Sequence, residues 1–359
     1  MFLSTDKKQL SELPRDCTFP ENDWHILAGF WHPVAFSKDI VDDKPIKSKL
    51  LDVELVLYRT VDGIAAARDL CVHRGAALSL GWMDDDCKNI VCPFHGLHYN
   101  RAGECTKIPS VDDPSKPIPK TIRLISYQAQ ERYGLIWVCL KPQASRPIPE
   151  WPLLENAEKE WLTIEIPQGF WKASASRHCE NFNDLAHISW VHMKTFGNRA
   201  RPGIIDYKLE LNDNGMLMEM PYIEVERGFN DDEGEREREV YYKHMFTFPF
   251  ATDLQVDYKT DEGDKVTSHF YDIGTPVSAR ETAIFQITQT NIPGSTAEDY
   301  AEYQLITNEE DIVVVESQRP EEVPLNIAEE IHIPADKFSI QYRRALVRLF
   351  GLGSPQMTS

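Results

Sequence analysis

The sequence predicts an α+β protein of two domains, an all-β N-terminal domain and a C-terminal domain in which helices cover an antiparallel sheet. Three observations support this prediction. Short β-type runs bounded by turn residues fill the chain from about residue 49 to residue 141. The proline-rich segment 142–152 then has the composition of a linker. Beyond it, strand-like runs alternate with turn clusters and are followed by helical segments. We therefore expect domains over 1–150 and 151–359.

The N-terminal domain is predicted to consist of short β-strands that follow a polar leading segment. Residues 1–45 are polar at first and then include an apolar stretch at 28–36. The strand candidates that follow are 51–59, 64–71, 89–100 and 133–142. We expect the compact core of this domain to extend from about residue 24 to residue 141.

The first part of the C-terminal domain is predicted to combine a strand, a helix and hairpins. We expect the strand at 161–176 and the helix at 178–193. The runs 208–220 and 256–273 contain the clusters Asn-Asp-Asn-Gly and Asp-Glu-Gly-Asp, which favour hairpin turns. The acidic run at 231–239 is expected to be a solvated loop.

The C-terminal end of the chain is predicted to be helical. A long helix is expected at 295–318, with Ser295 or Thr296 as its cap, and a last helix is expected from Asp336 to residue 351.

Composition excludes several classes of function. The 359 residues include 42% hydrophobic residues, and their formal net charge of −19 argues against a nucleic-acid partner. No apolar run approaches the roughly 18 residues of a membrane span, and the start of the chain is too weakly apolar for a secretory signal. Seven scattered cysteines do not describe a disulfide framework. We therefore expect a cytoplasmic enzyme without a membrane partner.

Two cysteines and two histidines form mixed pairs in the N-terminal domain, Cys71 with His73 and Cys92 with His95. A [2Fe–2S] centre of Rieske type needs two thiolates on one iron and two imidazoles on the other. A structural zinc site also accepts two cysteines and two histidines, but zinc fingers usually group the cysteines apart from the histidines. The mixed order therefore favours an iron–sulfur centre.

A second group, Asp184, His187 and His192, lies on the helix predicted at 178–193. Residues three apart share a helix face, whereas a step of five does not, so the helix is expected to distort or end between the two histidines. The imidazoles can then converge on one ion. Two histidines and a carboxylate from a distant part of the chain are the ligands of non-haem Fe(II) oxygenases. By itself, a histidine on an apolar helix more often belongs to the packed core.

These motifs together resemble those of a known family. The segments CVHRGAALSLG and CPFHGLHYNRAGEC resemble the Rieske signature, with Val72 and Leu97 where many members have proline and tryptophan. Residues 181–192 resemble the Asn-x-x-Asp-x-x-His-x(4)-His motif of Rieske non-haem iron oxygenases. The resemblance extends from about Trp24 to residue 351. It is strongest to the compact components without a small subunit, such as vanillate, dicamba and methylxanthine demethylases.

The resemblance implies a Rieske domain that holds a [2Fe–2S] cluster, followed by a helix-grip domain that holds a mononuclear Fe(II). The implied cluster ligands are Cys71, His73, Cys92 and His95, and the implied iron ligands are His187, His192 and Asp311. Glu310 is the nearest competitor of Asp311. Composition alone would make Asp311 a solvent-facing helix carboxylate.

The resemblance also implies a role for Asp184 and a set of partners. Asp184 would bridge His187 and His95 of a neighbouring subunit in a homotrimer and so carry electrons between the two metal sites. Without the resemblance it would be an ordinary acid near a helix N-terminus. Electrons would come from an NAD(P)H-dependent reductase, with or without a ferredoxin, because the chain has no flavin or dinucleotide fingerprint.

We therefore expect the terminal oxygenase of a multicomponent system, which uses O2 to monohydroxylate or oxidatively demethylate a small aromatic or heterocyclic molecule. One alternative is cis-dihydroxylation of an aromatic ring. More distant alternatives are an electron-transfer protein that uses only the cysteine–histidine site, and an interaction module stabilised by zinc.

Overall fold

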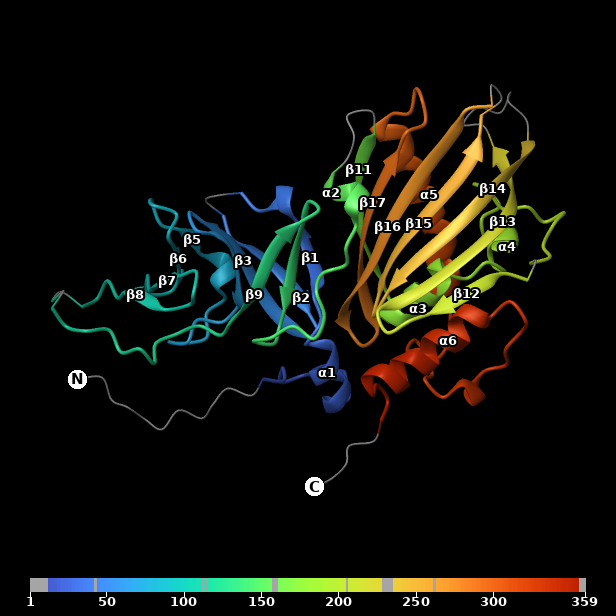
Figure 1. Cartoon of the computed structure of the whole chain (residues 1–359). Helices are drawn as coiled ribbons and strands as arrows, with labels where there is room; N and C mark the ends of the chain where they lie inside the picture. Colours follow the sequence, from blue (N-terminus) through green and yellow to red (C-terminus); the bar gives the residue numbers. More distant parts are fainter. Residues whose placement is uncertain are drawn as a thin grey trace. The chain divides into compact units, whose positions relative to one another are not determined.

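The computed structural model describes residues 12–41, 44–111, 113, 115–156, 161–204, 206–227, 235–260 and 263–354. The chain divides into two compact units, Met1–Ile148 and Pro149–Ser359 (Figure 1).

The first unit is built of two antiparallel sheets. The larger sheet has six strands in the order β1-β10-β9-β4-β3-β2, and the smaller sheet has four strands in the order β5-β6-β7-β8. The strands of the larger sheet are β1 (His32–Phe36), β2 (Ile46–Leu50), β3 (Val53–Thr60), β4 (Gly63–Arg68), β9 (Ser126–Arg132) and β10 (Leu135–Cys139). The strands of the smaller sheet are β5 (Trp82–Met83), β6 (Asn89–Val91), β7 (His98–Asn100) and β8 (Cys105–Lys107). A short helix, α1 (Glu21–Leu27), precedes β1.

One hydrophobic cluster joins the two sheets of the first unit. Tyr58 of β3, Ile90 of β6 and Tyr99 of β7 are completely buried in it, together with Leu78 of the 3₁₀ turn η2 (Leu78–Leu80). Fully burying a large apolar side chain stabilises a fold by about 1.5–3 kcal/mol. The cluster therefore fixes the short strands of the smaller sheet, which are too short to be stable by pairing alone.

The second unit contains a seven-stranded antiparallel sheet in the order β11-β17-β16-β15-β14-β13-β12. Its strands are β11 (Leu162–Trp171), β12 (Lys208–Leu211), β13 (Gly215–Arg227), β14 (Glu235–Thr247), β15 (Ala251–Lys259), β16 (Lys265–Ser278) and β17 (Glu281–Thr290). Strands β12 to β17 follow one another as hairpins, so each pairs with its neighbour in the sequence. The predicted antiparallel sheet with helices is confirmed.

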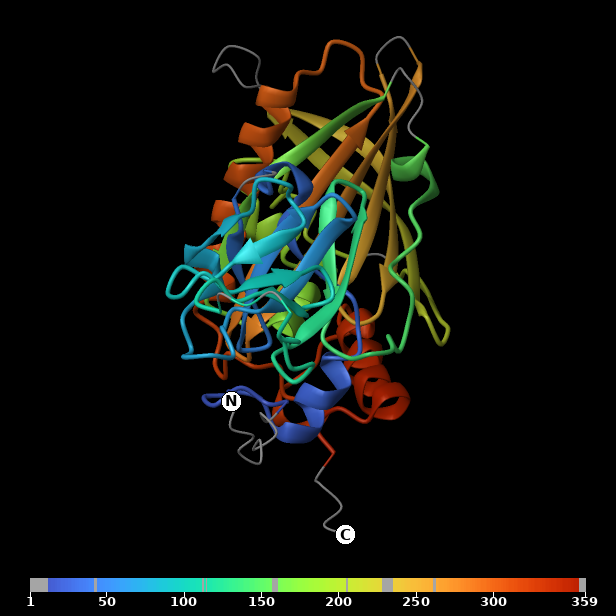
Figure 2. The ribbon, with the colours of Figure 1, turned by 90° about the vertical axis from the view of Figure 1, so that its left-hand side faces the viewer.

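Helices cover one face of this sheet. They are α3 (Ala175–Phe182), α4 (Ile188–Val191), α5 (Ala297–Val315) and α6 (Lys337–Ala345), and α6 continues as the π-helical turn η4 (Leu346–Phe350). The short helix α2 (Pro152–Glu155) precedes β11 and is not one of them. Short 3₁₀ turns lie at η1 (Ser37–Asp39) and η3 (Ile327–Glu329). Both views show α5 lying along the sheet (Figures 1 and 2), where it packs on β11 and α3, while α3 packs on β16 and β17. Among the described residues, no helix is long and apolar enough to cross a membrane.

A buried ion-pair network attaches the C-terminal helix to α3. The Arg343 guanidinium of α6 donates two hydrogen bonds to the Glu180 carboxylate of α3, at 2.5 and 2.7 Å. Glu330 lies 2.7 Å from Arg343 and 2.7 Å from Arg177 of α3. Both guanidinium groups are nearly inaccessible, so their charges depend on these carboxylates for compensation. Each also donates to a backbone carbonyl, Arg177 to that of Pro320 and Arg343 to that of Pro324.

Several sequence predictions of secondary structure are confirmed. The long helix is α5, and its cap is Thr296, whose hydroxyl accepts a hydrogen bond from the Asp299 N–H. The last helix is present as α6.

Two predictions are wrong. The helix at 178–193 is instead two short helices, α3 and α4, separated by a turn at Asn183. The acidic run at 231–239 is not wholly a loop, because residues 235–239 belong to β14, where Arg238 pairs with the Glu224 carboxylate of β13. Cross-strand charge pairing allows such a charged run to form a strand. Residues 231–234 lie outside the described residues.

Candidate metal centres and cavity

Two loops of the first unit share one hydrogen-bonding pattern. The Cys71 N–H donates to the carbonyl five residues later at 2.8 Å, and the Cys92 N–H does the same at 2.8 Å. The N–H groups of Gly75 and Gly96 then donate back to the carbonyls of the two cysteines, at 2.8 and 2.9 Å. Both glycines have positive φ angles, 75° and 69°, which side chains disfavour. Each loop therefore presents its cysteine from an equivalent position, whereas His73 lies two residues after its cysteine and His95 lies three.

The side chains of these loops suit a mixed sulfur and nitrogen centre. Cys71 and Cys92 are each only 1% exposed, and burial raises the pKa of the Cys92 thiol, as does the neighbouring Cys71. The His73 and His95 rings are exposed and lie 4.6 Å apart between centroids. Two buried sulfurs and two facing imidazoles on matched loops fit a cluster with thiolates on one iron and imidazoles on the other.

Tyr99 is a residue near this centre that the sequence analysis did not identify. Its hydroxyl on β7 lies 3.3 Å from Cys71 Sγ, and its side chain is completely buried. Burial raises the pKa of Tyr99, and the Cys71 sulfur raises it further, so the phenol stays protonated. The only signal in the sequence is an aromatic residue on the strand that follows the second loop.

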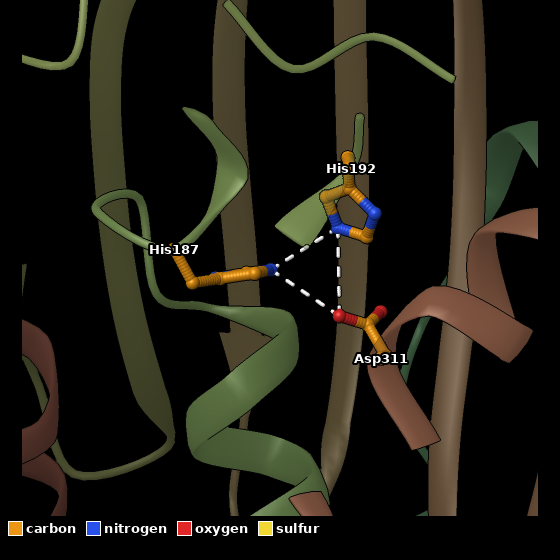
Figure 3. Close-up of side chains that lie close together, drawn as sticks. All are labelled: His187, His192 and Asp311. Atoms are coloured by element: carbon orange, nitrogen blue, oxygen red, sulfur yellow. Dashed lines mark hydrogen bonds and ion pairs between the residues drawn. The ribbon is translucent and has the colours of Figure 1, made fainter. Parts of the chain in front are cut away.

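Three potential ligand atoms of the second unit lie close together (Figure 3). His187 Nε2 lies 3.1 Å from His192 Nε2, and Asp311 Oδ1 lies 3.4 and 3.5 Å from these two nitrogens. Asp311 comes from α5, whereas the two histidines flank α4. Asp311 Oδ1 is buried and accepts no hydrogen bond from any described residue. A buried carboxylate oxygen without a donor, facing two imidazole nitrogens, fits a divalent cation.

Glu310, the competitor of Asp311, lies in a different place. Its Oε2 lies 3.4 Å from His192 Nδ1 and accepts a hydrogen bond from the Thr195 hydroxyl at 2.7 Å. Its Oε1 accepts a hydrogen bond from the Lys194 N–H at 2.6 Å. Glu310 therefore contacts the side of the His192 ring opposite to the nitrogen that faces Asp311.

Charges around the histidines alter their proton affinity. Burial alone would lower the pKa of His187, but the carboxylates of Asp184 and Asp311 raise it to about 9. Asp184 Oδ2 lies 3.8 Å from His187 Nδ1, and Asp184 Oδ1 accepts a hydrogen bond from the Ala186 N–H at 2.7 Å. Burial lowers the pKa of His192. The two imidazoles thus differ in environment, and Asp184 lies on the side of His187 away from the other ligand atoms.

The turn between α3 and α4 and a glycine after α4 permit the two histidines to converge. The Asn183 amide donates to the Cys179 carbonyl at 2.9 Å and so ends α3. Beyond α4, the Gly197 N–H donates to the His192 carbonyl at 2.6 Å. A Cβ atom on Gly197 would lie only 2.5 Å from the Ile188 carbonyl oxygen and 2.7 Å from that of His192. The chain after His192 can therefore fold back closely only with glycine at this position.

Each half of the chain matches a known protein family. The Rieske [2Fe–2S] domain model matches residues 30–127, and the model of the vanillate O-demethylase oxygenase C-terminal domain matches residues 171–350. The chain belongs to the Rieske non-haem iron oxygenases. Oxygenases of this family carry a [2Fe–2S] cluster and a mononuclear iron, and they work with reductase or ferredoxin partners and O2. The predictions of an oxidoreductase and of these two cofactors are confirmed.

Similar proteins include two demethylases of Pseudomonas putida. The methylxanthine N1-demethylase NdmA is 30% identical over 332 residues, which cover 90% of this chain and 89% of NdmA. The methylxanthine N3-demethylase NdmB is 27% identical, with 94% and 92% covered. The solved structure of NdmA with caffeine superposes with a TM-score of 0.75 at 26% identity, covering 90% of this chain and 91% of that one. Dicamba monooxygenase, at 21% identity and a TM-score of 0.73, shares the fold.

The oxygenase has a cavity of about 400 Å³ in its second unit. His187, His192 and Asp311 line it, and so do side chains from the helices and from the sheet. Its apolar lining residues include Trp171, Phe182, Phe196, Leu254, Val256 and Phe270. Polar side chains also line it, among them Glu224, Arg238 and Gln286. A cavity of this size that combines apolar and polar side chains is typical of a site for a small organic molecule.

Proposed function

We propose that this oxygenase monohydroxylates or oxidatively demethylates a small aromatic or heterocyclic molecule that binds in the cavity of its second unit. The observation that carries the proposal is the convergence of His187 Nε2, His192 Nε2 and Asp311 Oδ1 in the wall of that cavity. The demethylase relatives favour insertion of one oxygen atom over ring cis-dihydroxylation, which remains the second candidate.

The residues have distinct roles in this proposal. His187, His192 and Asp311 would hold the mononuclear iron on one face and leave its other positions open. When bound, the cluster supplies single electrons and the iron supplies the site where O2 is reduced and an oxygen atom is transferred. Aromatic and aliphatic side chains of the cavity, such as Phe182 and Leu254, would orient an apolar ring and exclude water.

The first unit would supply the ligands of the cluster, with Cys71 and Cys92 on one iron and His73 and His95 on the other. The Asp184 carboxylate faces His187 Nδ1 and would hold His187 in the tautomer that carries its hydrogen on Nδ1. The lone pair of Nε2 would then be free to bind iron. In a homotrimer the same carboxylate would bind His95 of the neighbouring subunit and link the two metal sites. We further propose an NAD(P)H-dependent reductase as the electron source and a cytoplasmic location.

Metal analysis and product analysis together test the proposal. The purified enzyme should contain about three irons per chain, two in the cluster and one mononuclear. With a surrogate reductase, O2 uptake should accompany formaldehyde release from a methylated aromatic or methylxanthine, or formation of a monohydroxylated product. An iron content of two per chain, with no mononuclear site, would refute the proposed oxygenase function. A cis-diol product would favour the second candidate.

The bridging role of Asp184 has its own test. Asp184→Ala should retain both metal sites and lose turnover. Asp213→Ala, which removes an exposed carboxylate from a hairpin turn outside the cavity, is the matched control. Undiminished turnover of the Asp184 variant would contradict the role.

A further inference from the structure

A buried histidine on the sheet lines the cavity but does not belong to the converging ligands. His244 of β14 is 3% exposed and lies directly across from Leu254 of β15, which also lines the cavity. Its Nδ1 lies 3.1 Å from Asn183 Oδ1. Its Nε2 is buried and forms no hydrogen bond with any residue that the structure describes.

Asn183 determines which nitrogen of His244 carries the hydrogen. The Asn183 side-chain NH₂ group donates to the Cys179 carbonyl at 2.9 Å and to the Thr252 hydroxyl at 3.0 Å. A backbone carbonyl only accepts, so the amide nitrogen must face Cys179 and the amide oxygen must face His244. That oxygen also only accepts, so His244 Nδ1 must donate to it. In the neutral ring, Nε2 then has a lone pair and no hydrogen.

The surroundings keep the His244 ring neutral. Burial, together with the nearby His187, lowers its pKa to about 3. The rings that contact it are those of Phe182 and Tyr242, at 6.5 and 6.1 Å between centroids. His244 Nε2 is therefore a hydrogen-bond acceptor in the wall of the cavity.

We propose that His244 Nε2 accepts a hydrogen bond from the substrate, and hence that the substrate carries an N–H or O–H group on its ring system. This inference rests on the proposed function, because it takes the cavity to be the substrate site. A buried acceptor that stays unpaired is costly, so a cavity with such a group discriminates against molecules that lack the donor. Methylation of the donor atom should therefore weaken binding.

Matched ligand pairs test the inference by equilibrium binding to the iron-loaded enzyme, measured by titration calorimetry. Suitable probes are theobromine with caffeine and phenol with anisole, because each pair differs by a methyl group in place of one N–H or O–H hydrogen. We expect the donor-bearing member to bind at least about tenfold more tightly than its methylated partner.

Two variants separate the role of Nε2 from structural effects. His244→Asn keeps a side-chain NH₂ group to donate to Asn183 and removes the atom at Nε2, so it should abolish the preference within each pair. His269→Asn is the matched control, because His269 is also buried and its Nδ1 also faces a side-chain oxygen, that of Asp253 at 2.8 Å, but it does not line the cavity. This control should keep the preference.

The outcomes distinguish the inference from the function on which it rests. Equal affinities within the pairs, or a preference that persists in His244→Asn, would overturn the role of His244. If the enzyme forms product coupled to O2 uptake but binds donor-bearing and methylated probes equally, the role of His244 is overturned and the proposed function stands. A His244-dependent preference without any O2-coupled product would support the acceptor and count against the proposed function.

Discussion

Replacing Glu310 by glutamine is expected to weaken iron binding, although Glu310 provides none of the three converging atoms. Its carboxylate is nearly inaccessible and has three neighbours, the Lys194 N–H, the Thr195 hydroxyl and His192 Nδ1. If His192 binds iron through Nε2, its hydrogen lies on Nδ1 and faces Glu310 Oε2. A glutamine has one carbonyl oxygen, so it cannot accept from Lys194 and from His192 together.

The size of the effect follows from the donor that loses its acceptor. An unpaired buried donor costs about 1–3 kcal/mol. Because about 1.4 kcal/mol corresponds to a factor of ten, the Kd should rise by roughly 5- to 150-fold. Loss of the hydrogen-bond partner of a metal-binding histidine typically weakens metal affinity by about 10- to 100-fold. We therefore expect the Kd for Fe²⁺ to rise by about 10- to 100-fold.

Anaerobic titration of the iron-depleted second site with Fe²⁺, with the cluster intact, measures this Kd. Glu309→Gln is the matched control, because it removes the same charge from the neighbouring exposed residue of α5. Asp311→Asn should abolish binding. A Glu310→Gln enzyme that binds Fe²⁺ as tightly as the Glu309→Gln enzyme would refute the reasoning. If Glu310→Gln abolished binding and Asp311→Asn did not, Glu310 would be the ligand.

Three further predictions concern the cluster, acid stability and the ion-pair network. Tyr99→Phe should lower the reduction potential of the cluster by about 40 mV in a redox titration. The reason is that a hydrogen bond of about 1 kcal/mol from Tyr99 to the Cys71 sulfur favours the reduced state. An unchanged potential would contradict this. Burial lowers the pKa of His32 to about 4, whereas its pKa in the unfolded chain is about 6.5. Between about pH 6.5 and pH 4 the unfolded state therefore binds more protons than the folded state, so the free energy of unfolding falls as the pH drops through this range. His32→Gln should remove about 2 kcal/mol of the stability difference between pH 7 and pH 5 in urea unfolding, and an identical pH dependence would argue against it. Glu180→Ala should cost about 3–5 kcal/mol in the same assay, because Arg343 loses two buried hydrogen bonds, and adding Arg343→Met should recover part of that loss.

Features that depend on neighbouring residues could be predicted from the sequence. The spacing of Cys71 with His73, and of Cys92 with His95, belongs to two tight loops, and each loop closes on its own backbone hydrogen bonds. The long helix α5 was predictable from its length and its cap, Thr296. The break between α3 and α4 was missed, although Asn183 and Asp184 are residues that favour such a turn.

Features that depend on contacts between distant segments could not be predicted from residue patterns alone. Asp311 was identified only through the family resemblance, since nothing near it in the sequence distinguishes it from Glu310. The structure distinguishes Asp311 from Glu310 because successive helical positions point about 100° apart. The Asp311 carboxylate therefore faces His192 Nε2, whereas the Glu310 carboxylate faces His192 Nδ1. His244 had no partner in the sequence, because Asn183 lies on another element.

The cavity of this oxygenase is lined by two independent structural layers. The converging ligand atoms come from α5 and from the segment around α4, whereas the part of the wall around His244 comes from strands of the sheet. On β15 and β16 the lining side chains occupy alternate positions, Leu254, Val256 and Tyr258 on one strand and Ser268 and Phe270 on the other. Each can be exchanged without moving the backbone that carries the metal-binding residues. Substitutions at single strand positions, in evolution or in engineering, can therefore change which molecule is oxidised while the metal-binding residues stay the same.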